Sequence, residues 1–159
     1  MDILKVGILG TGGIAEWMAG TLQGLAGETS AYAVASRSKE KAEAFAKTWG
    51  FEKAYGSYEE LVADPEVDLV YVATPHSHHY EHIKMCLRYG KNILCEKAFT
   101  ANARQAEEVL LEARERGLLL TEAIWTRYMP SRKIIDDIID QYENEINSLE
   151  ELNNAKIYI

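Results

Sequence analysis

Residues 5–15 read Lys5-Val6-Gly7-Ile8-Leu9-Gly10-Thr11-Gly12-Gly13-Ile14-Ala15, and this stretch decides the fold. An apolar run ends in Gly-x-Gly-x-x-Ala and passes directly into 16–22, which continues as a helical pattern. A strand, a tight turn and a helix start in this order place a dinucleotide pyrophosphate on unpaired backbone N–H groups. Gly10 allows the turn, Gly12 lets the main chain approach the phosphates, and Ala15 permits close packing of helix on strand. We therefore predict cofactor contacts at 10–15, against the alternative of a purely structural turn.

The end of the second apolar run, 31–35, bears on which dinucleotide binds. An NAD site has an Asp or Glu about 20 residues past the glycines, on the ribose 2′-OH. Here the run ends instead in Ser36-Arg37-Ser38-Lys39. A hydroxyl beside the forked donors of a guanidinium suits a 2′-phosphate, so we predict contacts from Ser36 and Arg37 and a preference for NADP over NAD. The alternative, which is compatible with this one, is that a serine caps the next helix and Arg37 is merely solvated.

Length and composition limit the classes of function. The 159 residues suit one domain with a real core, and 47% hydrophobic with 26% charged residues is ordinary for a globular protein. A net charge of −8 argues against nucleic acid or an anionic membrane as a partner. Two cysteines without Cys-x-x-Cys spacing indicate a reducing, cytoplasmic location. The acidic residues between 136 and 151 are interpreted as a solvated helix face.

Short β-rich runs alternate with longer helical patterns along the chain. Strands are expected at 3–9, 31–35, 51–55, 67–73, 92–95 and 118–121, and helices at 14–25, 39–49, 57–62, 78–89 and 101–116. Strands separated by helices predict an α/β fold with a doubly wound parallel sheet, the Rossmann fold. In such a sheet the ligand lies outside the carboxyl ends of the strands. Three polar segments follow those ends, at 74–79, 96–98 and 122–130.

These motifs together resemble the Gfo/Idh/MocA family, the relatives of glucose–fructose oxidoreductase and inositol dehydrogenase. The matching features are Gly10-x-Gly12-x-x-Ala15, Ser36-Arg37, Ala73-Thr74-Pro75 with His79, Cys95-Glu96-Lys97, and Glu122-Ala123-x-Trp125-x-Arg127-x-x-Pro130. The resemblance implies hydride transfer between a nicotinamide cofactor and a secondary alcohol or carbonyl of a small sugar-like or cyclic diol substrate. It also implies that Lys97 is the catalytic residue, positioning and protonating the reacting oxygen. The further cofactor contacts predicted at the strand ends are Ala73, Thr74, Pro75, His76, His79, Glu96, Lys97, Trp125 and Arg127.

The chemistry of Lys97 also follows without the family. A lysine beside a buried cofactor is partly desolvated, which lowers its pKa, and even when charged it stabilises a developing alkoxide. The alternative is a Glu96–Lys97 ion pair at the surface.

The four histidines lie between 76 and 82. His76 and His79 are expected to face the cofactor cleft, and His78 and His82 to be surface or packing residues on one helix. Two histidines without a carboxylate ligand are a weak zinc signal, so no metal is predicted. Trp125 and Arg127 are placed at the cleft because they follow a strand end. The alternatives are that Trp125 fills a gap and that Arg127 pairs with Glu122.

Two features depart from the family pattern. Ala98 stands where the family has proline, which leaves that corner freer. Family members are also about twice as long, with a second α+β substrate domain that is essentially absent here. We therefore predict a nucleotide-binding domain at 1–124, and at 125–159 a connecting helix followed by a strand at 155–159. The unpaired edge of that strand predicts a homo-oligomer. The alternative function is a dinucleotide-binding module without catalysis of its own.

Overall fold

The computed structural model describes residues 3–155, and side chains at 3–148. The chain forms two compact units, 1–123 and 124–159. The strands of the first unit are β1 (Leu4–Leu9), β2 (Thr29–Ala35), β3 (Lys53–Tyr55), β4 (Leu69–Val72), β5 (Asn92–Cys95) and β6 (Leu120–Glu122). Its helices are α1 (Gly13–Gly24), α2 (Lys39–Trp49), α3 (Tyr58–Ala63), α4 (His79–Arg88) and α5 (Ala103–Glu115), with a short 3-10 turn, η1 (His76–His78).

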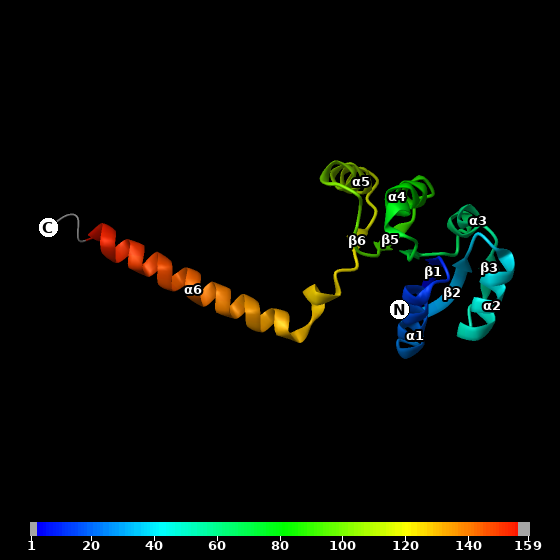
Figure 1. Cartoon of the computed structure of the whole chain (residues 1–159), viewed down its shortest axis with the longest axis horizontal. Helices are drawn as coiled ribbons and strands as arrows, with labels where there is room; N and C mark the ends of the chain where they lie inside the picture. The colour runs from blue at the N-terminus through cyan, green and yellow to red at the C-terminus, as the bar shows by residue number, and fades with distance from the viewer. Residues whose placement is uncertain (1–2, 156–159) are drawn as a thin grey trace. The chain divides into compact units, whose positions relative to one another are not determined.

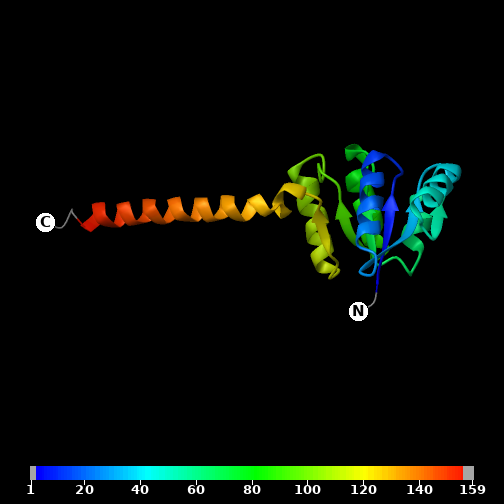
Figure 2. The same ribbon diagram turned by 90° about the horizontal axis from the view of Figure 1, so that it is seen from below.

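The six strands form one sheet in the order β3-β2-β1-β4-β5-β6, and every paired neighbour is parallel. Helices cover both faces, with α1 and α2 on one side and α3, α4 and α5 on the other (Figures 1 and 2). One core, around Ile8 and Phe45, lies under α1 and α2. The other core, around Leu61, Ile83 and Val109, lies under the remaining helices. The predicted doubly wound parallel sheet is confirmed.

Local sequence accounts for the element boundaries. The Ser38 side chain caps α2 by accepting the Lys41 N–H at 3.3 Å, and Ser57 caps α3 in a reciprocal capping box with Glu60. Gly117, with φ +66°, ends α5. The last strand was expected at 118–121 but begins two residues later and ends one residue later, at 120–122. Glu122 is therefore part of this strand, and its side chain accepts the Phe99 N–H at 2.9 Å.

The second unit contains a 3-10 turn, η2 (Trp125–Tyr128), and the long helix α6 (Pro130–Ala155). The helical pattern predicted at 131–139 is confirmed, with proline at the first helical position. Ion pairs of i,i+4 spacing join Arg132 to Asp136 and Lys133 to Asp137. The strand predicted at 155–159 is wrong at Ala155, which ends α6, and its remainder lies outside the described residues.

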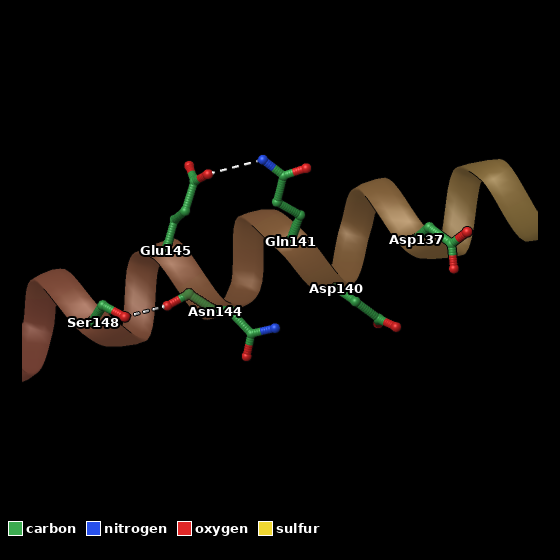
Figure 3. A pocket seen from close by; sticks show the side chains of 6 residues that line it. All are labelled: Asp137, Asp140, Gln141, Asn144, Glu145 and Ser148. Atoms are coloured by element: carbon green, nitrogen blue, oxygen red, sulfur yellow. Dashed lines mark hydrogen bonds between the residues drawn. The ribbon is translucent and has the colours of Figure 1, made fainter.

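A shallow hollow runs along α6 (Figure 3). Its six lining residues are Asp137, Asp140, Gln141, Asn144, Glu145 and Ser148. The polar contacts there are those of neighbouring turns, from the Gln141 amide to Glu145 at 3.0 Å and from the Ser148 hydroxyl to the Asn144 carbonyl at 2.8 Å. Because every wall belongs to one helix, we assign no site to it. Within residues 3–155, no helix has both the length and the apolar character that crossing a membrane requires.

Candidate functional site

A groove of about 780 Å³ lies at the carboxyl ends of β1, β2 and β4. It is lined by Gly10, Thr11, Gly12, Glu16, Ser36, Arg37, Lys41, Ala44, Phe45, Thr48, Trp49, Tyr58, Ala73, Thr74 and Pro75. Three segments predicted from separate strand ends, 10–12, 36–37 and 73–75, thus meet in one place. The strand order reverses at β1, with β2 on one side and β4 on the other, and this is where open parallel sheets bind ligands.

The turn after β1 fits a phosphate group. Gly10 has φ +108°, and a Cβ there would lie 2.8 Å from the Ala73 carbonyl oxygen, so only glycine fits without strain. Gly12 is the N-cap of α1 and makes no side-chain cap; the Ala15 N–H donates to the Gly12 carbonyl at 2.9 Å, which leaves the N–H groups of Gly13 and Ile14 for an anion. A Cβ on Gly12 would meet nothing within 4 Å, so the space above it is open. Gly13 and Ile14 begin the helix, and Ala15 is fully buried against the sheet.

Hydroxyl and cationic groups gather at the end of β2. Ser36 is buried and its Oγ accepts the Ser38 N–H at 3.4 Å, while Arg37 is exposed at the groove. Because Ser38 is the cap of α2, the capping interpretation holds for that serine and leaves Ser36 at the groove. Lys41, in the first turn of α2, adds a second cation that the sequence analysis missed. Its place in the first turn of the helix that follows the strand was the available signal.

The polar residues after β4 divide between groove and core. Thr74 is buried, and its Oγ1 lies 2.8 Å from Nδ1 of His82. His82 packs edge-on against Tyr58, and burial, followed by the charge of His78, lowers the pKa of His82 to about 4. His76 is exposed and is not among the lining residues.

His79 departs from its predicted place. It was expected to face the cleft, but the ring is fully buried. Nε2 lies 2.8 Å from the Thr74 carbonyl oxygen and Nδ1 lies 2.8 Å from that of Ala98. A carbonyl oxygen only accepts, so in the neutral ring the nitrogen that carries the proton donates to one of these two carbonyls, and the tautomer decides which. His79 therefore joins the loop after β4 to the loop after β5.

Glu96 and Lys97 occupy different environments at the end of β5. Glu96 is 9% exposed; the Tyr71 hydroxyl donates to its Oε1, and the Lys97 main-chain N–H donates to its Oε2 at 3.2 Å. Burial, and secondly this hydrogen bond to Glu96, raises the pKa of Tyr71 well above its usual range. Lys97 is exposed, and its desolvation beside a bound cofactor stays a prediction. The surface-pair alternative is wrong, because Glu96 is buried and contacts the main chain of Lys97.

The loop at Ala98 has proline neither at this position nor beside it, but two polar contacts hold its main chain. The Ala98 carbonyl oxygen lies 2.8 Å from Nδ1 of His79. The Phe99 N–H donates to the Glu122 side chain at 2.9 Å. Trp125 and Arg127 belong to the second unit, where Trp125 is 64% exposed. Their assignment to the cofactor stays a prediction.

Comparison with known proteins identifies relatives of this chain. A family profile described as the oxidoreductase family, NAD-binding Rossmann fold, matches residues 4–124. D-xylose 1-dehydrogenase (NADP(+)) of Hypocrea jecorina is 47% identical over 147 residues, which is 86% of this chain and 38% of that protein. Trans-1,2-dihydrobenzene-1,2-diol dehydrogenase of Macaca fascicularis is 42% identical over 139 residues, 87% of this chain and 42% of that protein. The chain thus spans about two fifths of the length of these curated relatives.

Solved structures show the same likeness. An NAD binding oxidoreductase from Klebsiella pneumoniae superimposes with a TM-score of 0.82 at 31% identity, covering 87% of this chain and 39% of that one. KijD10, a 3-ketoreductase from Actinomadura kijaniata solved with NADP, gives a TM-score of 0.80 at 35% identity, covering 88% of this chain and 44% of that one.

Proposed function

The chain belongs to the Gfo/Idh/MocA oxidoreductase family, whose NAD-binding Rossmann domain it contains, and on this premise we propose that its groove binds NADP for hydride transfer at a secondary alcohol or carbonyl. The observation that carries the proposal is the meeting of the glycine turn with Ser36, Arg37 and Lys41 in one groove. The names of the relatives, a D-xylose 1-dehydrogenase (NADP(+)) and a trans-1,2-dihydrobenzene-1,2-diol dehydrogenase, support a sugar-like or cyclic diol substrate.

The strand order and the lining residues support one assignment of the cofactor's parts. Ser36, Arg37 and Lys41 at the β2 end would hold the 2′-phosphate. The N-terminus of α1 at Gly12 would hold the pyrophosphate. Residues that follow β4 and β5, among them Glu96 and Lys97, would lie at the nicotinamide half. When bound, the nicotinamide donates or accepts the hydride. The ammonium group of Lys97 stabilises the alkoxide oxygen of the substrate and exchanges a proton with it.

One observation favours a second function, dinucleotide binding without turnover by this chain. The chain spans about two fifths of the length of the curated relatives that it matches. Replacing Lys97 by methionine separates the two functions. Any substrate-dependent oxidation of NADPH by the full chain is expected to disappear in this variant while NADPH affinity is kept. Turnover that is unchanged by the substitution would remove Lys97 from the mechanism.

A fluorescence titration of the full chain with NADPH and, in parallel, with NADH tests the binding proposal itself. We expect saturable binding that favours NADPH. A preference for NADH would contradict the assignment of the 2′-phosphate to Ser36, Arg37 and Lys41. Failure to bind either dinucleotide would contradict the proposed function.

A further inference from the structure

A buried carboxylate, that of Glu96, lies next to the part of the groove that is proposed to hold the nicotinamide. Ala73, which lines the groove, and Glu96 follow Val72 and Cys95, which are paired in register on β4 and β5. Tyr71 and Ala73 belong to the core beneath α1. Because the Tyr71 hydroxyl donates to Glu96, the carboxylate lies on that same face of the sheet, next to Ala73.

The hydrogen bonds of Glu96 leave its negative charge without a cationic partner. Each carboxylate oxygen accepts one bond, from the Tyr71 hydroxyl and from the Lys97 main-chain N–H. An ionised carboxylate is an acceptor only, so both donors are satisfied by the charged form. Within residues 3–148, no lysine, arginine or histidine side chain forms an ion pair with Glu96. Buried charges are normally paired, so an unpaired carboxylate beside a ligand groove requires an explanation.

The two redox states of the cofactor differ in charge at that end. The oxidised nicotinamide ring carries a positive charge, and the reduced ring is neutral. A fixed negative charge nearby therefore attracts the oxidised ring by Coulomb interaction and leaves the reduced ring almost unaffected. The Lys97 side chain is exposed and, among the described residues, forms no ion pair with Glu96, so it does not neutralise the buried charge.

We propose that Tyr71 is a positioning residue that holds the Glu96 carboxylate at the nicotinamide end, so that the groove binds oxidised NADP more tightly than a neutral end would. The inference rests on the proposed function, since it presupposes that the groove holds this cofactor. It assigns Tyr71 and Glu96 to the balance between the two redox states rather than to the reaction step.

Isothermal titration calorimetry of the full chain with NADP⁺ and with NADPH tests this assignment. The quantity compared is the ratio of the two dissociation constants. In Glu96→Gln, which keeps the shape and removes the charge, NADP⁺ binding is expected to weaken about tenfold relative to NADPH. Tyr71→Phe keeps the packing and removes the hydroxyl, so the ratio is expected to shift in the same direction by a smaller factor. Glu107→Gln, which removes an equal charge from the exposed face of α5, is the matched control and is expected to leave the ratio unchanged.

The outcomes separate this inference from the proposed function. If Glu96→Gln and Tyr71→Phe give the same ratio of NADP⁺ to NADPH dissociation constants as the unmodified chain, Glu96 does not act on the charge of the ring. The inference is then overturned, while the proposal of NADP binding stands. A ratio shift of the same size in Glu107→Gln also overturns it, because net charge alone then explains the effect. If the unmodified chain binds neither form, the proposed function fails and this inference fails with it. If Glu96→Gln does not fold, Tyr71→Phe decides the question.

Discussion

Replacing Gly10 by alanine is expected to lower the free energy of unfolding of the first unit by about 3 kcal/mol. The first contribution is backbone strain, because Gly10 has φ +108° and a side chain at such an angle costs about 1–3 kcal/mol. The second is overlap, because the new Cβ would lie 2.8 Å from the Ala73 carbonyl oxygen, a backbone atom held in β4 and its following turn. Relieving such an overlap costs about 1–3 kcal/mol. Urea unfolding followed by far-ultraviolet circular dichroism measures the difference.

Gly12→Ala provides the matched control. Gly12 has φ −88° and its added Cβ would meet nothing within 4 Å, so the stability is expected to change by no more than about 1 kcal/mol. The methyl group would, however, occupy the space through which phosphates approach the α1 N-terminus, so NADPH affinity is expected to fall. Equal stability of Gly10→Ala and the unmodified chain would refute the reasoning. A loss in Gly12→Ala as large as that in Gly10→Ala would refute it equally.

Two further predictions concern charge. Arg37→Gln is expected to weaken NADPH binding about tenfold or more and to leave NADH binding unchanged, because a charge-assisted hydrogen bond contributes about 1.5–3 kcal/mol. Parallel fluorescence titrations measure the ratio of the two dissociation constants. Equal weakening of NADPH and NADH binding would contradict the 2′-phosphate assignment. Burial holds the pKa of His82 at about 4, below the ordinary 6.5, so between these pH values the unfolded chain binds a proton that the folded chain does not. The free energy of unfolding is therefore expected to decrease as the pH is lowered from 6.5 to 4. His82→Gln is expected to flatten this part of the stability curve measured by urea unfolding, and an unchanged slope would contradict the assignment.

Most of the first unit could be predicted because its signals are local. The bounds of α2 and β5 agree with the expected 39–49 and 92–95, since a serine cap precedes the helix and polar residues flank the strand. The glycine turn, Ser36 and Arg37 were found because each directly follows an apolar run. The bounds of the last strand differ from the expected ones because residues 118–120 are apolar and 121–122 are polar, so the sequence pattern does not mark its ends. The pairing register with β5 decides them.

The parts of the site that were missed depend on contacts distant in sequence. Lys41 and Tyr58 reach the groove from the first turns of α2 and α3, which only the folded sheet brings together. His79 was expected at the cleft because its segment follows a strand end and matches the family pattern. Its ring nitrogens lie against the carbonyls of Thr74 and Ala98, and Ala98 is 19 residues away. Nothing in the local pattern identifies that partner.

The strand order has a consequence for how such a protein can diversify. The groups proposed to select the cofactor lie between β2 and the first turn of α2, whereas those proposed to face the reacting ring follow β4 and β5, on the other side of β1. Substitutions at 36–41 therefore leave the hydrogen bonds of Tyr71, His79 and Glu96 intact. The residues proposed to select the coenzyme and those proposed to face the reacting ring thus belong to separate segments. Laboratory evolution of the six residues 36–41 is therefore expected to change coenzyme preference without rebuilding the proposed redox end.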